Sequence, residues 1–147
     1  MLALRGPELD FRELKLLLEQ RCRELCAGTG LRIRIDGRLE SPELVAFHEQ
    51  VLPSCFELVS NAARHARPRQ VELELDVDAS EVRIRVNDDG AGLSLDVWRD
   101  SAGGLRGVRE RVRRLGGDIE LASSASGTRF LLRLPRPLRS AAPAEGS

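Results

Sequence analysis

The sequence predicts an α+β fold, a two-layer α/β sandwich in which a mixed, mostly antiparallel sheet is covered on one face by three helices. Two observations lead to this prediction. Apolar residues recur every three or four positions in three segments, and they alternate with polar residues in other, shorter segments. Along the chain these segments give the order helix, strand, helix, two strands, helix, two strands.

Three segments carry the helical repeat. The first spans residues 8–27 and ends at Gly-Thr-Gly, because glycine commonly terminates a helix. The second spans about residues 42–66 and contains Pro53, which should kink or divide it because proline lacks an N–H and clashes with the preceding turn. The third spans residues 105–115, has its apolar residues on one side, and is followed by a Gly-Gly pair.

The strands are predicted from the two-residue alternation of apolar side chains. They cover residues 31–35, 71–77, 82–86, 118–123 and 128–135. The segment between the third strand and the third helix, rich in Gly, Asp and Ser, is predicted to be a flexible loop.

Length and composition narrow the function classes. The 147 residues are enough for one core, and we expect one domain over residues 1–135 followed by a disordered tail over residues 136–147, rich in Pro, Ala and Ser. The 23 basic and 23 acidic residues balance, which argues against binding to nucleic acid or to an anionic membrane.

The cysteines and the hydropathy bear on where the protein works. Cys22, Cys26 and Cys55 include no C-x-x-C pair, which argues against a disulfide framework or a zinc site and favours packing thiols in a reducing compartment. No apolar run approaches the ~20 residues that span a bilayer. We therefore expect a cytoplasmic protein without direct membrane insertion, either free or as the cytosolic part of a membrane-bound sensor.

The second helix has an unusual polar side. Glu57 and Asn61 are four residues apart and share a face, and Arg64 and His65 follow one turn later. Oxygen atoms of Glu and Asn suit Mg²⁺, and Arg neutralises phosphate, so this set could hold a metal-bound polyphosphate. A solvated surface helix would show the same polar side, so both interpretations stay open.

A second candidate lies where the third strand meets the loop. The apolar row of residues 82–86 continues to Asp88 on the same face, where an unpaired carboxylate is costly. A ligand that offers N–H donors would explain it, and Gly90 and Gly92 would let a flat ring approach the backbone. The alternative is a hairpin turn with exposed Asp and Gly.

A third candidate opens the last helix. Gly103 and Gly104 precede it, and free N–H groups at a helix start bind phosphate. The alternative is that these glycines only mark the boundary of the helix, where glycine is common. The spacing of these segments excludes a calcium hand, a dinucleotide fingerprint and a Walker A loop.

Taken together and in this order, the three segments resemble the ATP-binding domain of the GHKL superfamily, which includes gyrase, histidine kinases and MutL. ELVSNAARHA at 57–66 is similar to its N box, DDGAG at 88–92 to its D-x-G-x-G box, and GGLRGVRERV from Gly103 to its second glycine box. The residues within these motifs are most similar to those of the nitrate-sensor and desaturase-thermosensor class of bacterial sensor histidine kinases. The resemblance implies a Bergerat-type fold.

The resemblance also implies roles for single residues. Asn61 would bind Mg²⁺, Glu57 would act beside the γ-phosphate as acid/base or ordering group, and Asp88 would accept from the adenine amino group. The other implied nucleotide contacts are Arg64 and His65 at the phosphates, Gly90 and Gly92 at the adenine pocket, Gly103, Gly104 and Leu105 at the phosphate-side helix, and Thr128 at the adenine edge.

The function implied is that of a histidine kinase catalytic domain. It would bind ATP and Mg²⁺, phosphorylate a histidine on a dimerisation domain that this chain lacks, and so serve a response regulator indirectly. One alternative is a stand-alone anti-sigma-type serine kinase. Another is a degenerate nucleotide-binding module without transfer activity, because Ala102 stands where the family's second glycine box usually has glycine, and Pro53 lies in the N-box helix. Trp98 falls in the predicted flexible loop, which the resemblance implies is a lid over the nucleotide.

Overall fold

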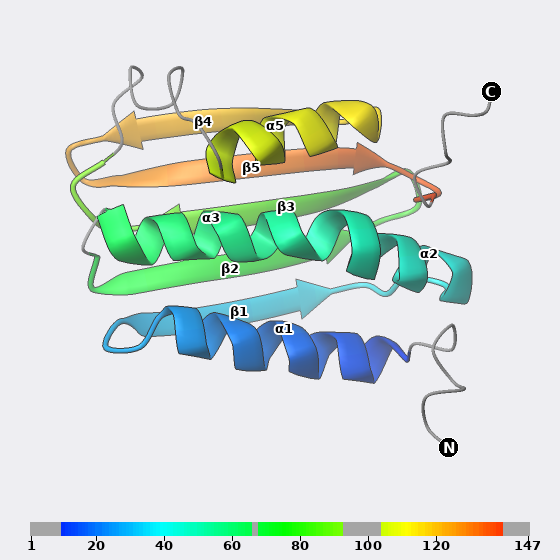
Figure 1. Cartoon of the computed structure of the whole chain (residues 1–147), viewed down its shortest axis with the longest axis horizontal. Coiled ribbons are helices and arrows are strands. Elements are labelled where there is room, and N and C mark those ends of the chain that lie inside the picture. Colours follow the sequence, from blue (N-terminus) through cyan, green and yellow to red (C-terminus); the bar gives the residue numbers. More distant parts are fainter. Residues whose placement is uncertain (1–9, 66–67, 93–103, 140–147) are drawn as a thin grey trace.

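The computed structural model describes residues 10–65, 68–92 and 104–139 (Figure 1). In these residues five strands form one open sheet in the order β1-β2-β3-β5-β4. The strands are β1 (Gly30–Asp36), β2 (Gln70–Val77), β3 (Glu81–Asp88), β4 (Asp118–Ser124) and β5 (Gly127–Pro135). β1 runs parallel to β2, and the other neighbouring strands are antiparallel. The prediction of a mixed, mostly antiparallel sheet is confirmed.

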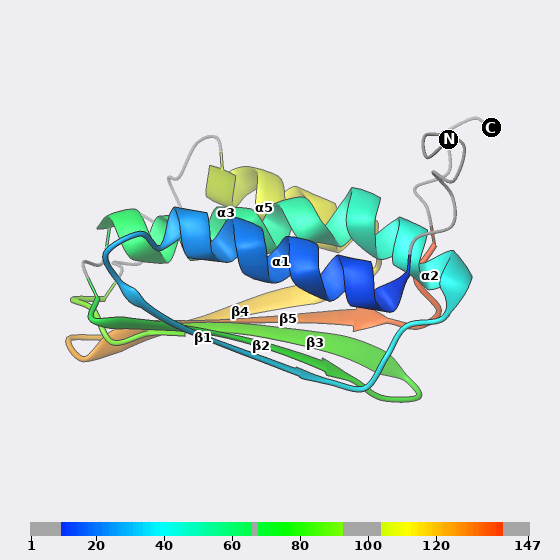
Figure 2. The same ribbon diagram turned by 90° about the horizontal axis from the view of Figure 1, so that it is seen from below.

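All described helices cover the same face of this sheet (Figures 1 and 2). They are α1 (Phe11–Leu25), α2 (Ser41–Ala46), η2 (Phe47–Val51), α3 (Leu52–His65) and α5 (Gly104–Arg114). Because α2, η2 and α3 follow one another without a break, the helices form three units, as the sequence predicts.

Pro53 does divide the second helix, through a local change of helical register. The turn before it, η2, is a π-helix, and the N–H of Leu52 donates to the carbonyl oxygen of Phe47, five residues back. α3 begins at Leu52, so Pro53 is its second residue. Proline has no N–H to continue the intrahelical hydrogen bonds, and the wider π-helical turn comes directly before it.

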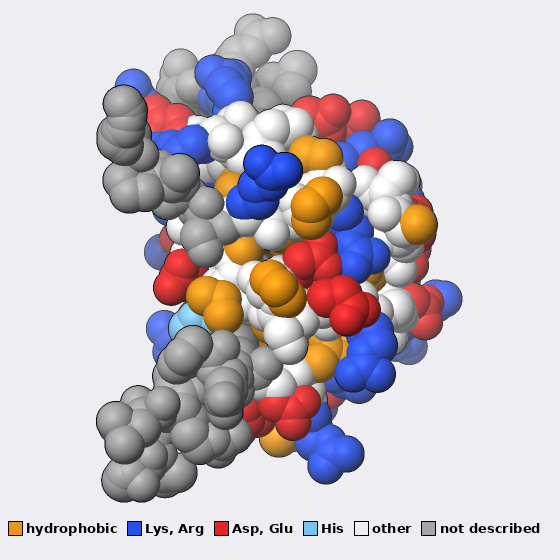
Figure 3. Space-filling view, turned by 90° about the vertical axis from the view of Figure 1, so that its right-hand side faces the viewer, with side chains coloured by type: hydrophobic (Ala, Val, Ile, Leu, Met, Phe, Trp, Pro, Cys, Tyr) orange, Lys and Arg blue, Asp and Glu red, His pale blue; other side chains and the backbone are white. Residues whose placement is uncertain are grey.

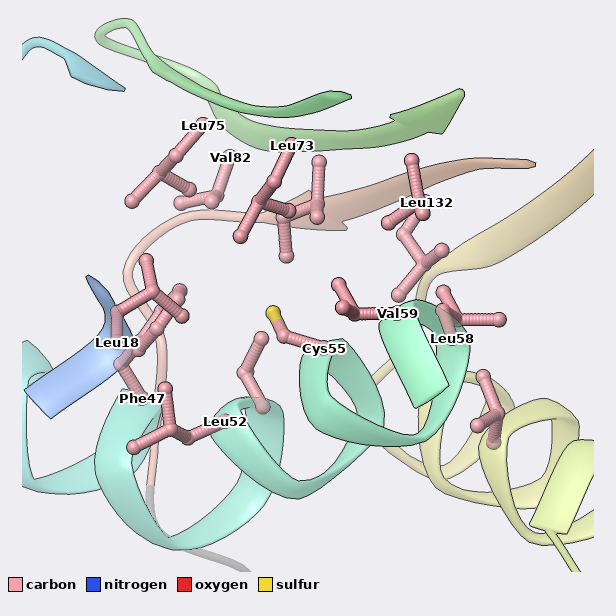
Figure 4. Close-up of a cluster of buried hydrophobic side chains, with 14 of the residues drawn as sticks. Leu18, Phe47, Leu52, Cys55, Leu58, Val59, Leu73, Leu75, Val82 and Leu132 are labelled. Carbon is pink, nitrogen blue, oxygen red and sulfur yellow. The ribbon is translucent and has the colours of Figure 1, made fainter. Parts of the chain in front are cut away.

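The core lies between the sheet and the helices. Alternate residues of β2, β3 and β5 point toward the helices and are buried. Figure 4 shows part of this core, in which side chains of the sheet meet those of the helices: Leu18, Phe47, Leu52, Cys55, Leu58, Val59, Leu73, Leu75, Val82 and Leu132. The three cysteines are buried free thiols, as expected, and burial raises the pKa of Cys22 to about 12.

The other face of the sheet is charged. Arg32 of β1 pairs with Glu72 of β2 at 3.3 Å, and Arg83 of β3 pairs with Asp76 of β2 at 3.3 Å. Each of these ion pairs contributes little to stability. Their charged side chains make this face of the sheet suited to contact with solvent. Acidic and basic side chains are also interspersed at the end of the molecule near α2 (Figure 3).

The packed chain extends beyond the domain boundary expected at residue 135. The Arg136 guanidinium forms two hydrogen bonds to the Glu43 carboxylate, from Nη2 to Oε1 at 2.6 Å and from Nε to Oε2 at 2.9 Å. Leu138 is only 6% exposed. Residues 136–139 are therefore part of the fold, because one Arg and one Leu anchor a segment whose composition is typical of a tail. Residues 140–147 lie outside the described residues. Among the described helices, none is long and apolar enough to cross a membrane.

Candidate functional site

Three of the predicted site segments meet at one end of the sandwich. The last turns of α3, the end of β3 and the start of β5 lie at the left of Figure 1. β3 and β5 are paired there, with Asp88 opposite Thr128. The tertiary structure thus places at one end segments that lie far apart in the chain.

The polar face of α3 forms a small hydrogen-bonded group. Asn61 Nδ2 lies 3.5 Å from Glu57 Oε2, and Arg64 Nη2 lies 3.8 Å from the same oxygen. The Glu57 side chain is 30% exposed, so it is accessible from outside. Because Asn61 uses its NH₂ group here, its Oδ1 atom is left for another ligand. His65 ends α3, and its side chain lies outside the described part of the structure.

Asp88 ends β3 on the helix-facing side, as the alternation predicts. It is half-buried, and its Oδ1 accepts a hydrogen bond from the Gly90 N–H at 2.9 Å. Burial raises the pKa of Asp88, the N–H groups of Gly90 and Thr128 oppose that rise, and the charge of Asp89 adds to it. Among the described residues, no Arg or Lys forms a salt bridge with this carboxylate. Asp88 is therefore partly dehydrated without a compensating cation.

The neighbouring acid, Asp89, has a different role, which the sequence analysis did not predict. Its Oδ1 accepts from the backbone N–H of Arg69 at 2.8 Å and of Gln70 at 3.0 Å, where β2 begins. These hydrogen bonds, that of Gln70 first, lower the pKa of Asp89. One acid of the Asp-Asp pair therefore holds the adjacent strand, and only the other faces the interior.

Two glycines are required by close backbone packing. Gly92 has φ +94°, and a Cβ atom there would collide with the carbonyl oxygen of Ser124 in the β4–β5 turn. Gly127 has φ +147°, and a Cβ atom there would collide with the carbonyl oxygen of Asp88. Packing against Ser124 is therefore sufficient reason for glycine at 92, without the approach of a flat ring that the sequence analysis invoked. Gly127 was not among the predicted site residues, although it sets how closely β5 approaches Asp88.

Thr128 is buried, at 5% exposure, and its Oγ1 lies 3.3 Å from Ser123 Oγ. A hollow of about 450 Å³ lies beside it at the end of the sheet. Its lining includes Glu72, Asn87 and Arg129, which are aligned across β2, β3 and β5 on the charged face. Glu57 and Asn61 are not part of that lining, so the hollow does not coincide with the polar face of α3.

The predicted phosphate-side helix begins at Gly104, the first residue of α5. Leu105 follows and its side chain is buried, at 4% exposure, so only its backbone N–H can serve a ligand at this helix start. Gly103, Ala102 and Trp98 lie outside the described residues, and the predictions made for them stay predictions.

The sequence model of the "Histidine kinase-, DNA gyrase B-, and HSP90-like ATPase" family matches residues 53–138, which include α3, β2, β3, α5, β4 and β5. The chain belongs to this ATPase family. The segments quoted as its N box, D-x-G-x-G box and second glycine box all fall inside the matched range.

Two curated relatives of the ATPase family are sensor proteins. The nitrate/nitrite sensor protein NarX of Escherichia coli is 29% identical over 116 residues, which are 78% of this chain and 19% of NarX. The signal transduction histidine-protein kinase/phosphatase UhpB of Salmonella typhimurium is 30% identical over 135 residues, which are 90% of this chain and 27% of UhpB. The chain therefore spans about a fifth to a quarter of the length of these relatives.

Solved structures with this fold include histidine kinases. The histidine kinase domain of the Erythrobacter litoralis EL346 blue-light activated histidine kinase superposes with a TM-score of 0.70 at 21% identity, covering 84% of this chain and 59% of that one. The mycobacterial sensor histidine kinase MprB superposes with a TM-score of 0.63 at 18% identity, covering 90% and 97%. The predicted resemblance and the predicted fold class are both confirmed, and the family assigns ATP as the ligand class.

Proposed function

We propose that this chain is the catalytic domain of a sensor histidine kinase, which binds ATP with Mg²⁺ and donates the γ-phosphate to a histidine of a dimerisation domain. A response regulator would then receive the phosphoryl group. The observation that carries the proposal is the half-buried Asp88 carboxylate, which has no cationic partner among the described residues. Family membership and the relatives NarX and UhpB support it.

Adenine recognition follows from the state of Asp88. A carboxylate that has lost part of its hydration gains most from a hydrogen bond to a good donor, and the exocyclic amine of adenine is such a donor. The Gly90 N–H donates to Asp88 Oδ1 and so fixes one oxygen of the carboxylate, and Asp88 also lines the hollow beside Thr128. The buried Thr128 hydroxyl lies on the paired strand and bounds the same region.

The residues present also fit a phosphate-bound magnesium ion. No group of three or more His, Cys, Asp and Glu side chains able to hold a metal occurs within the described residues. Mg²⁺ characteristically uses one or two protein oxygens and takes the rest from phosphates and water, and Asn61 Oδ1 next to Glu57 offers such an oxygen. When bound, the ion would neutralise charge on the β- and γ-phosphates.

In phosphoryl transfer the catalytic domain itself forms no covalent bond to the substrate. A ring nitrogen of the acceptor histidine attacks the γ-phosphorus, the bond from phosphorus to the bridging oxygen breaks, and ADP leaves with that electron pair. The other ring nitrogen then releases its proton, for which Glu57 is the acceptor or the ordering group. Positioning and charge neutralisation therefore supply most of the rate, and Arg64 beside Glu57 contributes positive charge at the phosphates.

Calorimetric titration with ATP and with ADP, each with and without Mg²⁺, tests the proposal. We expect saturable 1:1 binding of both nucleotides, tighter for ATP when Mg²⁺ is present. Adding labelled ATP and a separately prepared dimerisation domain should then place label on histidine. Label on a protein serine would favour the anti-sigma-type kinase, and tight binding without any label would favour the degenerate module. Absence of nucleotide binding would refute the proposal.

A further inference from the structure

One hydrogen bond joins the two helices that carry the proposed phosphate site. Arg111 Nε of α5 donates to Ser54 Oγ of α3 at 3.1 Å. Ser54 is only 1% exposed, and Arg111 is partly buried, so the bond lies between the helices and not on the outer surface. A hydrogen bond between a buried hydroxyl and a charged donor is costly to break, because the buried hydroxyl then lacks a partner.

Gly107 provides the space for this contact. It precedes Arg111 by one helical turn, and a Cβ atom at Gly107 would lie 3.3 Å from Arg111 Nη1 and 3.7 Å from Nη2. Glycine is a poor helix former, so its presence inside α5 calls for a reason. Without a side chain at 107 the guanidinium can lie across α5 and reach α3.

Ser54 also stands on the functional side of α3. Residues 54, 57 and 61 are separated by three and four positions, so Ser54, Glu57 and Asn61 share one helical face. On the other helix, Arg111 lies seven residues, or about two turns, after Gly104, with which α5 begins. This hydrogen bond therefore connects the helix face that carries Glu57 and Asn61 to the helix whose first turn offers free N–H groups.

We propose that Arg111 is a positioning residue: its bond to Ser54 sets how far the first turn of α5 lies from Glu57 and Asn61, and so how both helices engage the phosphates of ATP. This inference deepens the proposed function and rests on it. The adenine end of the site, formed by β3 and β5, does not depend on the contact. Loss of Arg111 should therefore weaken recognition of the phosphates and spare recognition of adenosine.

The test compares the affinities of Arg111→Met and Arg111→Lys for ATP with Mg²⁺ and for adenosine, measured by calorimetry and by competition. We expect Arg111→Met to bind ATP roughly tenfold more weakly while its adenosine affinity stays within about twofold of the wild type. Arg111→Lys should recover most of the loss, because a lysine amine can donate to Ser54 Oγ. The matched control is Arg113→Met, an exposed residue of the same helix, which should match the wild type.

A double-mutant cycle completes the experiment. Ser54→Ala should reproduce the loss of ATP affinity, and adding it to Arg111→Met should cause little further loss. Equal weakening of ATP and adenosine would assign Arg111 a merely structural role, and unchanged ATP affinity would assign it none, so either result overturns the inference. A wild-type protein that binds no ATP would instead refute the proposed function itself.

Discussion

α2 and the end of β3 lie at opposite ends of the sandwich (Figure 1), and each carries a carboxylate that is withdrawn from water. The two carboxylates differ in the groups that compensate them. Glu43 of α2 is 4% exposed and is held by both Nε and Nη2 of Arg136, with a further hydrogen bond from the Leu138 N–H at 3.2 Å. Asp88 is half-buried, and among the described residues it accepts from the backbone N–H groups of Gly90 and Thr128. The guanidinium lowers the pKa of Glu43, whereas burial raises that of Asp88.

The contrast separates a structural acid from a binding acid. A carboxylate that serves the fold has its full set of partners within the chain, so its ionised form is favoured. A carboxylate that serves a ligand remains incompletely satisfied until the ligand arrives, and the fold carries the cost of its dehydration. Substitutions at the two acids and at their partners can test this distinction.

Breaking the Glu43 pair should have the largest effect. Arg136→Met leaves a buried carboxylate without its cation and also removes a hydrogen bond from Nη1 to the carbonyl oxygen of Asp78. We expect the free energy of unfolding to fall by about 3 kcal/mol, measured by urea denaturation. The double variant Glu43→Gln with Arg136→Met should recover part of the loss, because no unpaired charge then remains. A loss below about 1 kcal/mol would show that the pair is not structural.

Removing the charge of Asp88 should affect binding instead of folding. Asp88→Asn keeps the size of the side chain but replaces the acceptor that the adenine amine needs, so ATP affinity should fall by tenfold or more. The free energy of unfolding should stay the same or rise, because the dehydration of a charge is relieved. Calorimetry and urea denaturation of the same preparation measure both quantities. Reduced stability with unchanged affinity would reverse the assignment of Asp88.

The two acids should also give opposite pH dependences of stability. The lowered pKa of Glu43 means that its contribution is present at neutral pH and is lost as the pH falls through that folded-state pKa. The raised pKa of Asp88 means that its ionisation costs stability above the folded-state pKa, and that this cost vanishes below the ordinary value of about 4.

Unfolding free energies at about pH 7 and about pH 3 measure this difference. The stability deficit of Glu43→Gln should shrink at the lower pH, whereas any stability gain of Asp88→Asn should disappear there. As the pH is lowered, affinity for ATP should begin to decline before an ordinary carboxylate would be protonated. The reason is that the raised pKa of Asp88 leads to earlier protonation, and protonated Asp88 is a poorer acceptor. Parallel pH profiles for the two variants would contradict the comparison.

The smallest effect is expected for Asp89→Asn, the neighbour of Asp88. Its hydrogen bonds to the N–H groups of Arg69 and Gln70 lie at the exposed start of β2, where water can replace them. We expect a small decrease in Tm by calorimetry, well below that of Arg136→Met, and an ATP affinity close to that of the wild type. A tenfold loss of affinity here would mean that both acids of the pair serve the ligand.

Much of the fold could be predicted because the apolar residues that repeat along each helix and strand are also the residues that the core buries. The alternation of β3 predicted that Asp88 faces the helices, and the structure confirms it. The division of the second helix before Pro53 also followed from covalent geometry, although not the π-helical turn that accomplishes it. The packing of Arg136 and Leu138 could not be predicted, because their partner Glu43 lies more than ninety residues away in the chain.

The site also combines features that one helix or strand determines with features that depend on packing between elements. Periodicity identified the shared face of Glu57 and Asn61 and the inward direction of Asp88, because a helix or a strand alone sets which side chains lie together. The separate task of Asp89 depends on where β2 begins beside β3, and the contact of Arg111 with Ser54 depends on how α5 packs against α3. These relations join segments distant in the chain. They were decided by tertiary packing, because hydrogen bonds between elements exist only once the core has set their separation.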